Sequence, residues 1–241
     1  MCTVVLLLRP DHPWPLILAA NRDEMLDRPW DPPAEHWPDR PGVVAGRDRL
    51  GGGTWMGINR HHVIAAVLNR QGSLGPRPGK RSRGELPLLA LEHPTAEAAA
   101  SAIAGLQAAA YRRFNMVLAD AAGAWFLRGL GQGHAEAILL QPGLHMVTAR
   151  DPNDPTSPRV ARHLARLQAA PPPAPPDQWE SWAALLADRS GPPESQLNIA
   201  PRVGFGTVCS SLAALGADGR AVWRFAPGPP DRAAFAPVQI L

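Results

Sequence analysis

The chain has 241 residues, of which 45% are hydrophobic and 19% charged, and its 24 basic and 21 acidic side chains give a formal net charge of +3. This charge permits an anionic ligand but is far below that of a nucleic-acid-binding domain, and no apolar run reaches the roughly 18 residues that a transmembrane helix needs. The two cysteines, Cys2 and Cys209, exclude a disulfide framework, so we expect a single cytoplasmic domain over residues 1–241.

The first half of the chain predicts hairpins separated by stiff loops. Apolar runs at Thr3–Leu8 and Leu16–Ala20 flank a Pro/Asp-rich turn, which is typical of two paired strands. Five prolines make residues 28–42 a long rigid loop, because proline removes backbone donors and fixes φ. Residues 43–69 predict a second hairpin that ends in VIAAVLN, and residues 70–84 form a basic, glycine-rich loop.

Helices and further hairpins follow. We expect a short helix over Glu85–Glu92 and a second one opening at Thr95, an N-cap residue followed by an alanine-rich run. Two more hairpins are expected, at residues 114–130 around DAAG and at residues 137–148 around QPG.

The last part of the chain predicts a helix pair and a final hairpin. Ser157-Pro158 is a typical helix start, the prolines of 171–176 form a stiff connector, and DQWESWAALLADR forms the second helix. Residues 203–226 then form a hairpin around GADGR. Strands and helices that come in separate runs favour an α+β fold in which helices cover the outer faces of two stacked antiparallel sheets.

The chemistry of interest is at the beginning of the chain. Removal of Met1 would give Cys2 both a thiol and a free α-amine, whose reference pKa near 8 lets it act as a base within the same residue. The hairpin would bring the polar run NRDE beside Cys2, with Arg22 favouring the thiolate and Asp23 orienting the amine. Neighbouring strand residues point to opposite faces, so both side chains reach Cys2 only if the strand ends or bulges there.

Asn69 is the third candidate, because its amide at the end of VIAAVLN could donate to an oxyanion from a strand that we expect in the same sheet. Purely structural roles compete with these assignments: a small buried thiol at Cys2, a surface turn at NRDE and a turn residue at Asn69. His61 and His62 are expected in a turn, and we expect no metal and no cofactor.

The motifs MC, AANRDE, GGGTWMGI and FNMVLAD together resemble the NRDE family, which includes the eukaryotic transport and Golgi organisation proteins. That family is similar to N-terminal-nucleophile hydrolases of the choloylglycine hydrolase and penicillin V acylase type. The resemblance implies a four-layer αββα sandwich, Cys2 as nucleophile, Arg22 and Asp23 as its supporting pair and Asn69 as the oxyanion donor. Ala149 stands where the acylase group has a further asparagine, and Val208 or Cys209 where it has an arginine.

Two functions follow as expectations. The first is a cysteine amidohydrolase that acts on a non-peptide C–N bond of a small-molecule substrate after removal of Met1. The alternative is a non-catalytic binding or trafficking protein for an anionic ligand such as haem or an acyl or lipid-type molecule, with the basic segment Arg77–Arg83 contributing. Three residues, Arg150, Asn153 and Arg202, are candidates to replace the missing asparagine and arginine.

Overall fold

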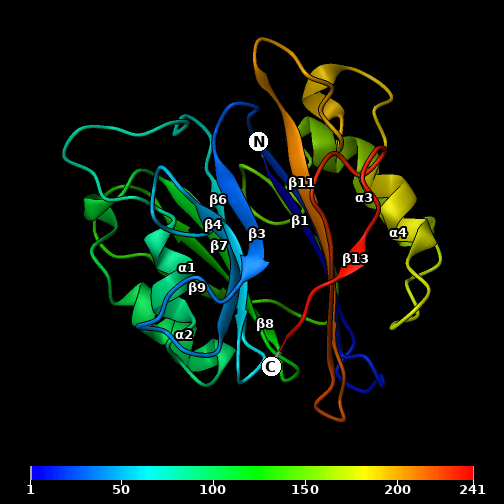
Figure 1. Cartoon of the computed structure of the whole chain (residues 1–241), viewed down its shortest axis with the longest axis horizontal. Helices are drawn as coiled ribbons and strands as arrows, with labels where there is room; N and C mark the ends of the chain where they lie inside the picture. Colours follow the sequence, from blue (N-terminus) through cyan, green and yellow to red (C-terminus); the bar gives the residue numbers. More distant parts are fainter. Residues whose placement is uncertain (1, 241) are drawn as a thin grey trace. The chain divides into compact units, whose positions relative to one another are not determined.

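A computed structural model describes residues 2–240 of the chain, in two compact units. Of the described residues, the first unit comprises 2–28 and 142–238, and the second comprises 29–141 with 239–240. Each unit consists of one antiparallel sheet with helices packed on it (Figure 1). The expectation of a single domain stays a prediction.

The first unit is built on a six-stranded sheet in which β1 and β2 form the predicted N-terminal hairpin. The strand order is β10-β1-β2-β11-β12-β13. Its strands are β1 (Thr3–Leu8), β2 (Leu16–Met25), β10 (Gly143–Val147), β11 (Phe205–Leu215), β12 (Ala221–Ala226) and β13 (Ala236–Pro237). Its helices are α3 (Pro158–Ala169), α4 (Glu180–Leu186) and the 3₁₀ turn η2 (Pro193–Ser195).

Alternation along β1 and β2 determines which side chains face the helices of this unit. Val5, Ile17 and Ala19 pack in one apolar cluster with Val160 of α3 and Trp182 of α4. Odd-numbered residues of both strands therefore point toward the helices, and even-numbered residues point to the opposite face.

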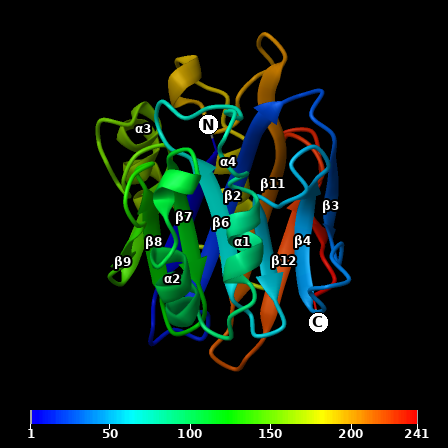
Figure 2. The same ribbon diagram turned by 90° about the vertical axis from the view of Figure 1, so that its left-hand side faces the viewer.

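The second unit is a seven-stranded sheet whose strands follow one another in sequence order, from β3 to β9. They are β3 (Trp30–Ala34), β4 (Val43–Asp48), β5 (Met56–Asn59), β6 (Ile64–Asn69), β7 (Phe114–Ala119), β8 (Ala124–Gly129) and β9 (Glu136–Leu139). Figure 2 shows α1 (Glu85–Ala90) and α2 (Ala96–Ala104) lying over one face of this sheet, and the 3₁₀ turn η1 (Ala108–Ala110) follows α2. As predicted, Thr95 caps α2, and its hydroxyl accepts a hydrogen bond from the Ala98 amide.

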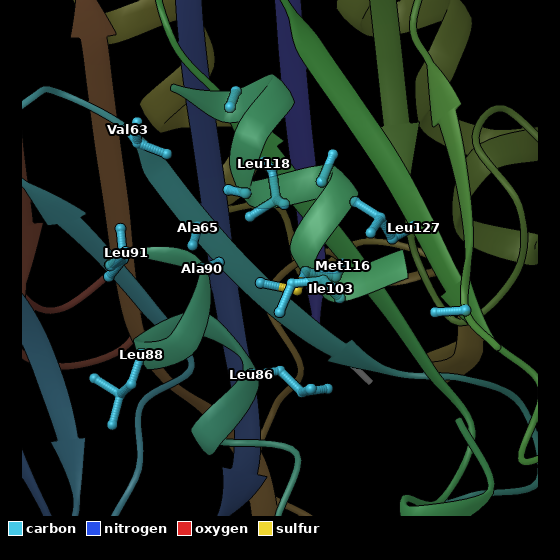
Figure 3. Packing of buried hydrophobic residues seen from close by; sticks show 14 of the residues in the cluster. Val63, Ala65, Leu86, Leu88, Ala90, Leu91, Ile103, Met116, Leu118 and Leu127 are labelled. Atoms are coloured by element: carbon cyan, nitrogen blue, oxygen red, sulfur yellow. The ribbon is translucent and has the colours of Figure 1, made fainter. Parts of the chain in front are cut away.

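The core of the second unit joins these helices to the sheet. Leu86 of α1 and Ile103 of α2 are buried in one cluster with Met116 and Leu118 of β7 (Figure 3). Small side chains such as Ala65 of β6 let the helices approach the strands closely.

Two sequence predictions about the strands are wrong. The run around QPG is not a hairpin, because β9 pairs with β8 in the second unit whereas β10 pairs with β1 in the first. The proline loop at 28–42 contains β3, an edge strand whose pairing with β4 shifts register between Asp31 and Ala34. Both intervening residues are prolines, which edges and bulges tolerate because no ladder bond is lost there.

Among the described residues, no helix is long and apolar enough to cross a membrane.

Candidate active site

Cys2 lies directly before β1, at the end of the first hairpin where NRDE is located. Thr3 pairs with Asn21, so Cys2 is level with Arg22 on the neighbouring strand. The Cys2 thiol is half-buried, and its Sγ donates to the carbonyl oxygen of Asp23 at 3.7 Å. Met1, whose removal the sequence predicts, lies outside the described residues.

The strand does not end at NRDE, contrary to the condition that the sequence suggested. β2 continues to Met25 and is paired with β11 over its whole length. The bulge lies on β11, where Thr207 is opposite Asp23 and Cys209 is opposite Arg22, which leaves Val208 as the extra residue. Arg22 and Asp23 therefore point to opposite faces of the sheet.

Asn21 is a structural clamp. Its amide nitrogen donates to the carbonyl oxygens of Leu186 and Leu197, both at 2.9 Å, and its Oδ1 accepts from the Ser210 hydroxyl at 2.6 Å. Leu186 is the last residue of α4, so Asn21 satisfies one of the carbonyls that a helix leaves unpaired at its end. The side chain is fully buried, and it fixes α4 to the sheet.

The Asp23 carboxylate also points to the helix side. Its Oδ1 accepts from the Thr207 hydroxyl at 2.6 Å, and its Oδ2 lies 2.8 Å from Nη2 of Arg159 on α3. The same guanidinium donates through Nη1 to the Thr3 hydroxyl at 2.9 Å. Both charged side chains are almost completely buried, with 4% of Arg159 and none of Asp23 exposed.

Arg22 lies on the other face, between the two cysteines of the chain. Burial, with the Asp23 charge second, raises the pKa of the Cys2 thiol above its ordinary value, whereas Arg22 acts to lower it. The influence of Arg22 on Cys2 thus has the expected direction, but burial outweighs it. Burial likewise raises the pKa of the Cys209 thiol, as expected of an inert buried strand cysteine.

Register also argues against a disulfide between the two cysteines. Cys2 and Cys209 flank Arg22 from the strands on either side of β2. Two strand spacings place their Cα atoms about 9–10 Å apart, beyond the roughly 7 Å that a disulfide spans.

The prediction that Asn69 shares a sheet with Cys2 is wrong. Asn69 ends β6, as expected, but β6 belongs to the sheet of the second unit, where Asn69 pairs with Phe114. The role of Asn69 as an oxyanion donor stays a prediction.

One proposed replacement for the missing acylase residues has a structural role instead. Asn153 accepts from the Met146 amide and donates to the Leu144 carbonyl, so it holds a loop to the edge strand β10. Arg202 lies in an exposed tight turn, Arg202–Phe205, before β11. His61 lies in the turn that was expected for the histidine pair, and His62 has a positive φ of 60°.

The basic loop is held by its own cations. Arg83 donates to the Ser73 carbonyl at 2.7 Å, Lys80 donates to the Ala109 carbonyl, and Arg81 forms a 2.6 Å ion pair with Glu85. These side chains stabilise the shape of the loop. Their proposed contact with an anionic ligand stays a prediction.

Comparisons with known proteins identify the family to which the chain belongs. Residues 1–203 match the family described as Transport and Golgi organisation 2. The chain belongs to this family. A Mus musculus Transport and Golgi organization 2 homolog is 33% identical over 138 residues, and the Homo sapiens homolog is 32% identical over the same length. These matches cover 54% of this chain and 49% of each relative, so the chain spans about half the length of the curated relatives it matches.

Known structures show the fold of this Transport and Golgi organisation 2 family member. A Caenorhabditis elegans N-acylethanolamine-hydrolyzing acid amidase ortholog matches with a TM-score of 0.62 and 13% identity, over 88% of this chain and 92% of that one. A variant of conjugated bile acid hydrolase from Clostridium perfringens matches with a TM-score of 0.51 and 10% identity, over 100% of this chain and 97% of that one. The predicted fold class, the αββα sandwich of N-terminal-nucleophile hydrolases, is confirmed.

Arg159 is the residue of this neighbourhood that the sequence did not reveal. It is 136 positions from Asp23 along the chain, in a helix whose start was predicted from Ser157-Pro158 alone. One signal was available: an arginine in the first turn of a helix opposes the helix dipole, and this turn carries no acidic residue of its own. A buried arginine at this position needs a carboxylate partner from another part of the fold, and that partner is Asp23.

Proposed function

We propose that the chain is a cysteine N-terminal-nucleophile amidohydrolase that acts on a non-peptide C–N bond of a small molecule after Met1 is removed. The observation that carries this proposal is the position of the Cys2 thiol, which is half-buried directly before β1, with its Sγ 3.7 Å from the Asp23 carbonyl oxygen and the residue level with Arg22. The names of the structural neighbours, an amidase and a hydrolase, support it.

The proposed step needs a base, because the raised pKa of the Cys2 thiol leaves the sulfur protonated near neutral pH. The sulfur attacks the carbonyl carbon of an acyl amide and forms a C–S bond, while its proton passes to the free α-amine of Cys2. The amine returns the proton to the nitrogen of the substrate as the C–N bond breaks. Water then hydrolyses the thioester, which releases the carboxylic acid and restores the thiol.

We assign Arg22 the role of opposing the effect of burial on the thiol, since its charge acts to lower the pKa of Cys2. The sequence resemblance gives the role of oxyanion donor to Asn69, and such a donor contributes roughly 3 kcal/mol in comparable sites. A cytoplasmic location is part of the proposal, because glutathione and thioredoxin keep thiols reduced there; cell fractionation tests it.

Two measurements test the proposal in sequence. Intact-mass spectrometry of the purified protein should show loss of the initiator methionine, and a fully retained Met1 would rule the mechanism out. A panel of acyl amides should then include substrates whose hydrolysis is abolished in Cys2→Ala and preserved in Cys209→Ala, the matched control at the other cysteine. Equal hydrolysis by Cys2→Ala and the wild type would contradict the role of Cys2.

A second candidate function is non-catalytic handling of an anionic apolar ligand such as haem or an acyl thioester. Ala149 at the position of the acylase asparagine and the transport-related name of the family favour it. Absorption spectra during titration with haem, and the same titration of Cys2→Ala, separate the two functions. Tight binding that Cys2→Ala leaves unchanged, with no amide hydrolysis by the wild type, supports the binding function.

A further inference from the structure

We infer that Arg159 is a positioning residue for Cys2. Its contacts with Thr3 and Asp23 connect helix α3 to the ends of β1 and β2, beside which the Cys2 thiol lies. This inference rests on the proposed function for its catalytic meaning. The contacts that support it involve only residues of the first unit.

The Arg159 guanidinium contacts two strands at once. Nη1 donates to the Thr3 hydroxyl at 2.9 Å and Nη2 lies 2.8 Å from Asp23 Oδ2, so one planar group joins β1 to β2. A lysine has a single nitrogen and no fork geometry, so it does not reproduce this bridge.

Both partners of Arg159 are connected to the Cys2 thiol. Thr3 is the residue next to Cys2 in sequence, and the Asp23 backbone carbonyl accepts from the Cys2 thiol. A displacement of either strand end moves Cys2 relative to its acceptor. Arg159 itself lies on the helix side of the sheet and acts through Thr3 and Asp23.

The position of Arg159 is costly for the stability of the fold. Burying a charged pair is expensive, and an arginine in the first turn of α3 opposes the helix dipole. Apolar side chains of similar size commonly stabilise such positions as well or better. The buried ion pair is therefore explained better by the geometry that it imposes on β1 and β2 than by stability alone.

The test uses the two cysteines as reporters. The full-length protein, labelled with 13C at cysteine Cβ, should give two NMR signals, one for each cysteine, assigned with Cys2→Ala. In Arg159→Met we expect the Cys2 signal to shift or split while the Cys209 signal keeps its position. Arg159→Lys should show the same effect to a smaller degree, and Arg162→Met, which removes an arginine one turn further along α3 that donates to Ser190, should move neither signal.

Arg159→Gln provides a second route if Arg159→Met fails to fold. Its single amide cannot contact both Thr3 and Asp23, so the Cys2 signal should again move alone. An unmoved Cys2 signal in these variants, or equal movement of both cysteine signals, would overturn the inference, because Arg159 would then be either unimportant or merely structural.

These outcomes are separable from those of the proposed function. The NMR signals need no substrate, so a selective response of Cys2 together with absent amide hydrolysis would leave the positioning role intact and remove the catalytic function. If hydrolysis depends on Cys2 but the Cys2 signal does not change in the Arg159 variants, the catalytic function stands and the positioning role is removed.

Discussion

Replacement of Asn21 by alanine tests whether the first residue of NRDE serves the fold or the chemistry. The change removes three buried hydrogen bonds, two to the carbonyls of Leu186 and Leu197 and one from the Ser210 hydroxyl. A buried polar group left without its partner costs about 1–3 kcal/mol, so two carbonyls and a hydroxyl together predict a loss of about 3 kcal/mol or more. For a chain of this size each kcal/mol lowers Tm by about 2–4 °C, which predicts a fall of about 6 °C or more.

Asn21→Asp refines this prediction because it keeps the shape of the side chain and replaces the amide donor by a second acceptor. It still accepts from Ser210 but turns an oxygen toward the carbonyls of Leu186 and Leu197. At neutral pH it should therefore be less stable than Asn21→Ala. Thermal unfolding followed by circular dichroism measures both variants, with Ser210→Ala as a control that loses one bond and about 1 kcal/mol. A Tm of Asn21→Ala within about 2 °C of the wild type would refute the clamp, and lost hydrolysis at that unchanged Tm would point to chemistry instead.

Three further predictions concern other parts of the chain. Gly129→Ala should destabilise the protein by about 1–3 kcal/mol in urea unfolding, because a Cβ there would lie 2.1 Å from the Phe114 ring; an unchanged midpoint would contradict this close packing. Hydrogen bonds from Arg49 and Arg47 lower the pKa of Asp31 to about 2, so Asp31 contributes stability above its unfolded pKa near 4 that is lost as the pH falls through 2. Asp31→Asn should abolish this contribution, so an acid unfolding curve identical to that of the wild type would count against it. Iodoacetamide should modify the half-buried Cys2 well before the buried Cys209, read by peptide mass spectrometry; equal rates would show that both thiols are equally accessible.

The N-terminal hairpin could be predicted because its information is local. Apolar runs on both sides of a short turn determine which residues of β1 and β2 are neighbours, and this alone brings NRDE beside Cys2. The same local logic gave a wrong result at QPG, where an equally plausible turn connects edge strands of two different sheets. Turn composition cannot distinguish a hairpin from a connection between sheets, because glycine and proline mark a loop in both cases.

Features that depend on contacts between distant parts of the chain could not be predicted from the sequence. The sheet to which Asn69 belongs depends on the order of all strands, and the partner of Asp23 comes from a helix 136 residues later. The sequence left open whether β2 ends or bulges at NRDE. In the structure β2 is regular there, and the bulge lies at Val208 of its partner β11. Such choices are decided by tertiary packing, and no window of sequence contains them.

Side chains alternate between the two faces of β2, so the residues of NRDE have different roles. Asn21 and Asp23 point to the helices, where they hold α4, β11 and α3, whereas Arg22 points to the face of the two thiols and Glu24 accepts from the Met25 amide. A loss of activity on changing Asn21 or Asp23 therefore reports first on the fold, and Arg22 is the position of the motif where a substitution tests the chemistry of Cys2 itself. Because the Arg22 charge acts to lower the pKa of the Cys2 thiol, Arg22→Gln should raise that pKa and leave the Tm closer to the wild-type value than Asn21→Ala does.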